Sequence, residues 1–246
     1  MSLKLARRPQ TLLFDLDGTL VDCVEWRAQL EFITLSLLEY RKRTGSFPRA
    51  LRSLRAVTRA LVYTAERPDG FTNAGRAGEV FGKLAGLPPD EALVFLEEAA
   101  ERLFPRIERH FFPVPGAADF VRWASGHFPM HLVTNPVWSE PVIRARVRWA
   151  GIDPALFKSL THSRRMHASK PSPLYYRDFL EQEGLRAEDC LLIGNDPIND
   201  LYAVRVGIPV CLVHPTRKSL KRPLEIPGAL APGYRTTFAE LREALA

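Results

Sequence analysis

Two carboxylates, two residues apart, follow a short apolar run near the start of the sequence. Asp15 and Asp17 come directly after residues 11–14, which are typical of a buried strand, and Gly18 and Thr19 continue into a turn. Ligands of open α/β sheets bind at the carboxyl ends of the strands. Because side chains alternate along a strand, we expect both carboxylates on one side, where one attacks a substrate while the other moves a proton. The alternative is a surface turn that carries acids.

A second acidic pair follows another apolar run. Asp196 and Asp200 lie in IGNDPIND, directly after the predicted strand at 190–194. Four acids at adjacent strand ends repel one another unless a hard divalent cation neutralises them, and Mg²⁺ binds through a few carboxylates, waters and substrate phosphate. The pattern predicts a Mg²⁺ site, with an ordinary Asn-, Asp- and Pro-rich turn as the alternative.

Three other polar residues stand beside predicted elements. Thr134 and Asn135 end the apolar run at 130–134, and Lys170, followed by Pro171, precedes a helical stretch. Each is weak evidence alone, because a lysine on a loop is usually solvated. Their value lies in their combination with the carboxylates.

The elements that position these residues alternate along the chain. Beyond residue 112, short apolar runs at 130–134, 157–161, 190–194 and 209–213 are separated by amphipathic stretches. This alternation is the βαβ signature of a parallel sheet covered by helices on both faces. Since the first strand lies far before the others, the helical residues between them must be an insertion. We predict an α/β core of residues 1–22 and 113–246 and an all-helical cap of residues 23–112.

The excess positive charge is concentrated in the predicted cap. The sequence has 34 basic and 28 acidic residues, a net charge of +6, and residues 41–67 hold eight basic residues and one acid. Between 49 and 62, an apolar helix face opposes an arginine stripe. The stripe is either a solvated face or, with Arg164 and Arg165, a field that attracts an anionic substrate. Its members are Arg49, Arg52, Arg55 and Arg59.

Two positions in the predicted cap are candidates for helix starts. We expect Asn73, in the polar stretch 71–79, to be an N-cap, the alternative being that this stretch reaches toward the core and selects substrate. We expect Asp90 to cap the next helix, whose apolar residues at 93, 96, 100, 103 and 107 share a face.

Taken in order, the four polar groups resemble the signature motifs of the haloacid dehalogenase superfamily. The first is DLDGTLVD at residues 15–22, the second is LVTN ending at Asn135, the third is Lys170 in SKPSP, and the fourth is GNDPIND. The resemblance covers nearly the whole chain, and the insertion after the first motif is similar to a C1-type cap. It implies a Rossmann-like sheet beneath a helical cap.

The resemblance also implies the chemistry of the acids. Asp15 would attack phosphorus and become an aspartyl phosphate, and Asp17 would protonate the leaving oxygen and then activate water. Mg²⁺ would be bound by Asp15, the main-chain carbonyl of Asp17 and Asp196, with Asp200 as a ligand or outer partner.

The same comparison assigns the phosphate-binding groups. Lys170 and the Thr134 hydroxyl would bind the phosphoryl oxygens, and Lys170 would also hold Asp15 ionised. Further substrate-binding candidates are Gly18, Thr19, Asn135 and, from the basic positions, Arg52, Arg55 and Arg164.

Within the superfamily, Asp17 argues against a haloacid dehalogenase, because those enzymes lack the second aspartate and release no alcohol that needs a proton. A phosphonatase would need a cap lysine, and Lys42 and Lys83 stand in no recognisable context. The sequence therefore predicts a Mg²⁺-dependent phosphomonoester hydrolase with a small anionic phosphometabolite as substrate. The alternatives are a phosphomutase or other phosphoryl transferase of the superfamily, and a noncatalytic phospholigand-binding protein.

Three departures from the family pattern limit what the resemblance carries over. The loop before Lys170 is basic at 164 and 165, Pro136 and Trp138 replace the usual glycine after the second motif, and Asn195 is an additional residue in the fourth. None removes a catalytic group, but the first two change the rim of the site, so no relative's substrate is transferred.

Composition excludes several other classes. A chain with 46% apolar and 25% charged residues is an ordinary globular protein. No apolar run approaches the ~20 residues that cross a bilayer, and no secretion signal is evident. The three cysteines argue against a disulfide framework. We expect a cytoplasmic protein without membrane or nucleic-acid partners. The sequence does not indicate which oligomeric state the protein has.

Overall fold

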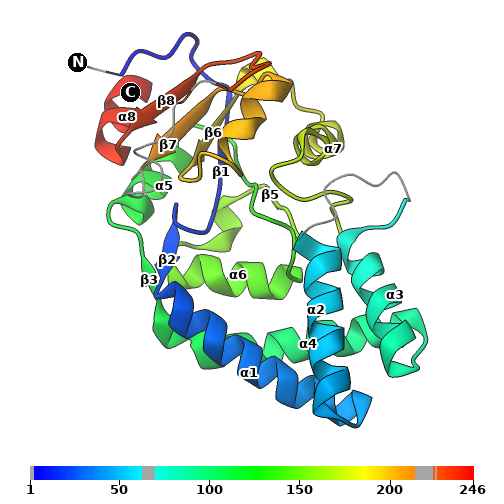
Figure 1. Ribbon diagram of the computed structural model, residues 1–246. Helices are drawn as coiled ribbons and strands as arrows, with labels where there is room; N and C mark the ends of the chain where they lie inside the picture. The colour runs from blue at the N-terminus through cyan, green and yellow to red at the C-terminus, as the bar shows by residue number, and fades with distance from the viewer. Residues whose placement is uncertain (1–2, 63–69, 214–223, 225) are drawn as a thin grey trace.

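A parallel sheet forms the core of the computed structural model, which describes residues 3–62, 70–213, 224 and 226–246 (Figure 1). Within these residues the six strands run in the order β5-β4-β1-β6-β7-β8, and every neighbouring pair is parallel. The predicted α/β class is therefore confirmed. The strands are β1 (Thr11–Phe14), β4 (Met130–Leu132), β5 (Ser159–Leu160), β6 (Cys190–Gly194), β7 (Val210–Val213) and β8 (Gly233–Thr236).

Helices cover both faces of the sheet. Along β1, Leu12 and Phe14 pack on the face covered by α5 (Ala117–Ser125), α6 (Glu140–Trp149) and α8 (Phe238–Leu245). Leu13 packs on the opposite face, against α7 (Pro173–Glu183) and the 3₁₀ helix Leu201–Val206. This alternation is the period of two of a strand, and burial on both faces explains why β1 and β6 are continuous apolar runs. The remaining 3₁₀ helices are Glu108–His110, Pro154–Leu156 and Ala187–Asp189.

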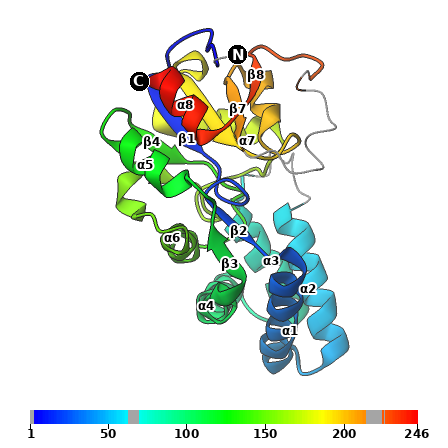
Figure 2. The ribbon, with the colours of Figure 1, turned by 90° about the vertical axis from the view of Figure 1, so that its left-hand side faces the viewer.

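The helical cap joins the core through a short antiparallel ribbon. β2 (Val21–Cys23) pairs with β3 (Phe111–Pro113), and between them lie α1 (Glu25–Thr44), α2 (Phe47–Val62), α3 (Asn73–Ala85) and α4 (Pro89–Ile107). The predicted boundaries at 22/23 and 112/113 fall within this ribbon. Figures 1 and 2 show the cap helices beyond the ribbon, on one side of the sheet. No helix in the described part of the chain is both long and apolar enough to span a bilayer.

The cap has its own apolar core, in which Phe81 stacks on Phe95 with ring centroids 5.2 Å apart. Two helix starts differ from the prediction: Thr72, rather than Asn73, is the N-cap of α3, and α4 begins at Pro89, one residue before Asp90. Proline suits that first position because its missing N–H would be unpaired there.

An aromatic cluster packs α1 and α4 of the cap against the core. Trp138, which replaces the usual glycine of the second motif, lies 5.1 Å from Phe32 and 4.6 Å from Phe104 between ring centroids. Trp149 of α6 stacks on Phe104 at 6.2 Å. Packing of this kind fixes the position of the cap beside the carboxyl ends of the strands.

Candidate active site

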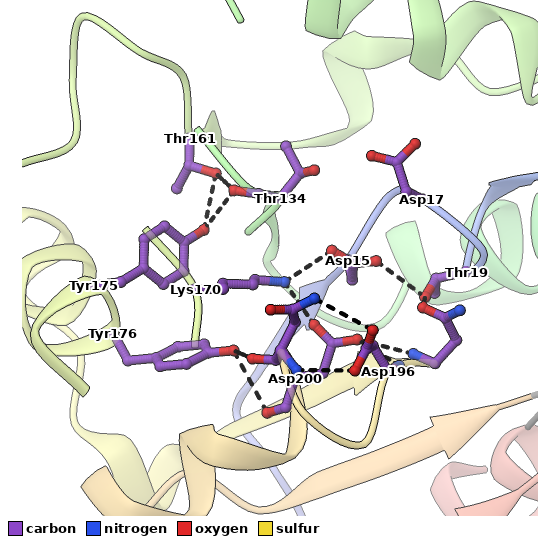
Figure 3. Close-up of polar contacts among 12 residues, drawn as sticks. Asp15, Asp17, Thr19, Thr134, Thr161, Lys170, Tyr175, Tyr176, Asp196 and Asp200 are labelled. Atoms are coloured by element: carbon purple, nitrogen blue, oxygen red, sulfur yellow. Dashed lines mark hydrogen bonds and ion pairs between the residues drawn. The ribbon is translucent and has the colours of Figure 1, made fainter. Parts of the chain in front are cut away.

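The carboxyl ends of β1 and β6 bring together two of the predicted acids, with the predicted lysine between them (Figure 3). Lys170 Nζ donates to Asp15 Oδ1 at 2.8 Å and to Asp200 Oδ1 at 2.6 Å. All three residues are buried, with 3%, 7% and 0% of their surfaces exposed. Parallel strands β1 and β6 are neighbours, so residues 185 positions apart meet at one edge of the sheet.

In this cluster, burial and the attraction between Lys170 and the carboxylates shift each pKa in opposite directions. Burial and repulsion from Asp200 raise the pKa of Asp15 from 3.8 to about 6, although Lys170 acts in the opposite direction. Burial alone would lower the pKa of Lys170, but the charges of Asp15 and Asp200 hold it well above its ordinary value. The ammonium group therefore stays charged and stabilises both carboxylates.

The second oxygen of Asp15 faces the turn that follows β1. Thr19 Oγ1 donates to Asp15 Oδ2 at 3.3 Å and also lies 3.2 Å from Asn195 Oδ1. Gly18 has a φ of +76°, and a Cβ there would lie 2.1 Å from the Asn195 amide nitrogen. Only glycine lets the turn pass this close to the loop after β6.

The loop after β6 is organised around Asp200. Its Oδ2 accepts the backbone N–H groups of Asn195 and Asp196 at 3.0 and 2.9 Å, while its Oδ1 bonds Lys170. A Cβ at Gly194 would lie 2.4 Å from the same carboxylate. Asp196 Oδ1 accepts backbone N–H groups of the following turn, from Ile198 at 2.6 Å and from residue 199 at 3.0 Å. Asp200 thus acts as a structural partner of the lysine.

The second motif is held through its backbone. The carbonyl oxygen of Thr134 accepts hydrogen bonds from the hydroxyls of Thr161 and Tyr175, both at 2.8 Å (Figure 3). Asn135 Oδ1 is buried without a hydrogen-bond partner. An unpaired buried acceptor is costly, and one directly after Thr134 is suited to accept a bond from a ligand.

Asp17 does not share a side with Asp15, contrary to the prediction. The strand ends at Phe14, so its period of two no longer applies at residue 17, and Figure 3 shows the Asp17 side chain turned away from Asp15. The Asp17 carboxylate is half exposed and pairs with the buried guanidinium of Arg146, from α6. This pairing places the second acid at the mouth of the site.

Arg146 is a site residue that the sequence analysis missed. It lies on the buried face of α6 with Val142 and Ile143, and its guanidinium carbon is 5.9 and 5.6 Å from the ring centroids of Phe104 and Phe111. Burial lowers its pKa to about 10, partly offset by the charge of Asp15. Its helical spacing from apolar residues was the signal available in the sequence, because a residue on the apolar face of a helix is expected to be buried.

The structure does not bring the predicted basic residues to the cluster. Arg52 and Arg55 are exposed on α2, and among the described residues neither forms an ion pair or lines the cavity between cap and core. Arg164 donates to the carboxylate of the cap residue Glu97 from Nε at 2.7 Å and from one terminal nitrogen at 2.5 Å. This ion pair joins the cap to the core. Part of the basic segment, residues 63–67, lies outside the described residues.

The donor atoms of the acidic cluster fit a hard divalent cation. The buried carboxylates of Asp15 and Asp200 outweigh the single charge of Lys170, burial makes that excess costly, and the partly exposed Asp196 lies on the same loop as Asp200. In the described ranges, no three His, Cys, Asp or Glu side chains form a cage for a metal. Mg²⁺ needs no such cage, because it binds through one or two carboxylates with waters and substrate phosphate.

Comparison with known proteins identifies the family. A family model described as haloacid dehalogenase-like hydrolase matches residues 9–206, which include all four motifs. The chain belongs to this family of hydrolases. A search of curated protein sequences found no match.

Haloacid dehalogenase-like structures share the fold over almost their full length. The magnesium-bound HAD-hydrolase YfnB of Bacillus subtilis has 21% identity and a TM-score of 0.55, with 97% of this chain and 99% of that chain covered. A HAD phosphatase of Thermococcus onnurineus has 21% identity and a TM-score of 0.58, with 96% and 98% covered. The L-2-haloacid dehalogenase of Xanthobacter autotrophicus has 17% identity and a TM-score of 0.54, with 96% and 97% covered. At these identities the likeness establishes the fold alone.

Proposed function

We propose that this hydrolase is a Mg²⁺-dependent phosphomonoester hydrolase that acts through an aspartyl phosphate on a small anionic phosphometabolite. The observation that carries the proposal is the Asp15 carboxylate, buried and held by the Lys170 ammonium, with a second acid, Asp17, at the mouth of the same site. A single nucleophilic carboxylate suffices for displacement at carbon. A phosphate ester also releases an alkoxide, which needs a proton donor.

Each residue then has a role that matches its surroundings. The free electron pair of an Asp15 oxygen attacks phosphorus, and the bond to the leaving oxygen breaks as that oxygen takes a proton from Asp17. Water then attacks the aspartyl phosphate, giving its proton to Asp17, and releases Asp15 with inorganic phosphate. Lys170 and the Thr134 hydroxyl bind the phosphoryl oxygens, and the unpaired Asn135 oxygen accepts a bond from substrate.

Mg²⁺ would be held by Asp15, the main-chain carbonyl of Asp17 and Asp196. Asp200 is better suited to an outer position, because it is completely buried, whereas Asp196 is partly exposed. When bound, the cation supplies charge neutralisation for the phosphoryl group and for the acidic cluster. The positions of the arginines give no support to Arg52, Arg55 or Arg164 as substrate ligands, so we leave them out of the proposed site.

The proposal also includes a reducing, cytoplasmic compartment. Cys23, Cys190 and Cys211 are all free thiols, and the latter two are buried in β6 and β7. Burial raises the pKa of both strand thiols to about 12, so they are inert toward alkylation.

Release of p-nitrophenol from its phosphate ester, with Mg²⁺ and after chelation, tests the activity. We expect turnover that chelation abolishes and added Mg²⁺ restores. A parallel assay measures chloride released from L-2-chloropropionate, because dehalogenases share the fold. Chloride release without phosphatase activity would assign the chain to the dehalogenase branch, and neither product would support the noncatalytic alternative.

Arg146→Met is expected to lower activity while changing the free energy of unfolding only a little. Methionine fills a similar volume beside Phe104 and Phe111, and removes a buried guanidinium whose Nε has no hydrogen-bond partner. The free energy of unfolding should therefore change by less than about 1.5 kcal/mol. Hydrolysis of an alkyl phosphate should fall about tenfold, because Asp17 loses the group that orients it.

The alkyl and p-nitrophenyl esters provide the internal control for that variant. The p-nitrophenolate leaving group needs little proton donation, so its ester should be affected less than the alkyl ester. Equal losses on both esters would contradict an action of Arg146 through Asp17.

A further inference from the structure

Asn73 connects the cap to both loops that carry phosphate-binding side chains. Its Nδ2 lies 3.2 Å from the carbonyl oxygen of Pro136, 3.3 Å from that of Ala168 and 3.1 Å from Ser169 Oγ. Pro136 directly follows Asn135, and Ser169 directly precedes Lys170. One cap amide therefore bonds the immediate neighbours of both groups.

The backbone at the start of α3 adds to this contact. The N–H of Asn73 donates to the carbonyl of Met166 at 2.9 Å, and the N–H of Ala74 donates to that of Ser163 at 2.8 Å. The first N–H groups of a helix have no partner within the helix, so here the loop before Lys170 supplies their acceptors. The N-terminus of α3 is thus docked along that loop.

Arg76 fixes the orientation of the Asn73 amide. Its Nη1 donates to Asn73 Oδ1 at 2.9 Å, and its Nη2 donates to the carbonyl of His167 at 2.9 Å. Asn73 is 1% exposed and Arg76 is 5% exposed. Because the arginine occupies the amide oxygen, the amide nitrogen must face the two loops.

The loop from residue 161 to residue 172 has no helix or strand of its own to hold it. Its main-chain groups near Lys170 are held by Asn73, Ala74 and Arg76, and Ser169 Oγ donates in turn to the carbonyl of Leu61 in α2 at 2.9 Å. Cap residues therefore supply much of the hydrogen bonding of the segment that positions the lysine.

We propose that Asn73 is a positioning residue whose amide couples docking of the cap to the placement of Lys170 and of the Thr134–Asn135 segment, so that the substrate-binding groups are complete only when the N-terminus of α3 is docked on the loop before Lys170. The proposal rests on the phosphatase function proposed above. It differs from a role in substrate contact, because Asn73 acts through the main chain of its neighbours.

Asn73→Asp is the sharpest test, since it keeps the volume and removes both amide hydrogens. A carboxylate oxygen would face the carbonyl oxygens of Pro136 and Ala168, which repel it. Asn73→Ser serves as a second variant, should the first fold poorly. Glu101→Gln is the matched control, because Glu101 accepts a hydrogen bond from Ser139 of the core at 3.0 Å and lies near the charge of Arg164, but within the described residues it bonds no main-chain group next to Lys170.

We expect both Asn73 variants to lower kcat/KM for p-nitrophenyl phosphate about tenfold or more and to weaken competitive inhibition by inorganic phosphate about tenfold. The control should change both by less than about threefold. A purely structural defect would reduce the active fraction of molecules and leave the inhibition constant for phosphate unchanged. An unchanged inhibition constant in both variants would therefore overturn the proposal.

Amide hydrogen exchange supplies a readout that needs no activity. Exchange at residues 166–170 should quicken about tenfold or more in the Asn73 variants, while β1 and β6 keep their protection. Equal exchange in variant and wild type would overturn the proposal even if activity fell. If the wild-type protein hydrolysed no phosphate ester, the proposed function would fail, and the exchange comparison would still decide whether Asn73 holds the loop.

Discussion

Asp15→Asn should lose Mg²⁺-dependent phosphatase activity by a factor on the order of 10⁴ or more. The amide that replaces the carboxylate is not a nucleophile toward phosphorus, and no neighbouring acid can take its place. Asp17 is turned away toward Arg146, and Asp200 is completely buried beneath the loop after β6. The rate of p-nitrophenol release, with and without Mg²⁺, measures the loss.

The fold of the Asp15→Asn variant should survive, which makes the activity result interpretable. The asparagine oxygen can still accept from Lys170, and the substitution removes a carboxylate whose pKa burial and Asp200 raise to about 6. The free energy of unfolding should therefore not fall by more than about 1 kcal/mol at pH 7. Full phosphatase activity in a correctly folded variant would rule out Asp15 as the nucleophile.

Lys170→Met should lower both activity and stability. The ammonium group is buried between two carboxylates at 2.8 and 2.6 Å, and methionine leaves both without a counter-charge. Breaking a buried ion pair by removing one partner costs about 3–5 kcal/mol. Turnover should fall about 10²–10³-fold, because a fixed positive charge no longer faces the phosphoryl oxygens.

The stability loss of Lys170→Met should depend on pH. Without the lysine, the pKa of Asp15 in the folded state rises further above its ordinary 3.8. A group with a raised folded-state pKa destabilises the folded protein where it is ionised, so the deficit from Asp15 should be larger at neutral pH and shrink as the pH falls to about 6, below which Asp15 is protonated in the wild type as well. Urea unfolding at pH 7 and pH 5 measures both values.

Lys158→Met is the control for that comparison. Lys158 is an exposed lysine that precedes β5, and its loss should change the free energy of unfolding by less than about 0.5 kcal/mol at either pH. A Lys170→Met variant as stable as this control at pH 7 would contradict the ion-pair cluster.

Much of the site could be derived from local patterns in the sequence. Apolar runs predicted β1 and β6, and the rule that parallel strands present their carboxyl ends to one edge predicted that Asp15 and Asp200 would meet. Lys170 could be assigned only through the resemblance of its motif to the family, because a lysine on a loop is usually solvated. The inferences about the strands and the acids need only short-range periodicity and topology.

The helical face of α1 shows where periodicity was insufficient. Apolar residues recur at helical spacing at Trp26, Leu30, Ile33, Leu37 and Tyr40, yet the first three are 64%, 61% and 43% exposed. Helical spacing predicts that residues share a face, but not which face another element covers. Of this series Tyr40 is buried, and the buried positions of α1 also include Ala28 and Leu35, which lie outside it.

The sequence by itself determined the family, the parallel sheet, the inserted cap and the residues that gather around Asp15. Only the tertiary structure decided that Asp17 faces Arg146, that Arg164 holds the cap, and that Asn73 bonds both phosphate-binding loops. Those contacts join residues 63 to 129 positions apart, and the contacts of Arg164 and Asn73 require the cap to be docked on the core. No local pattern encodes such pairings, because they depend on how elements far apart in the sequence pack together.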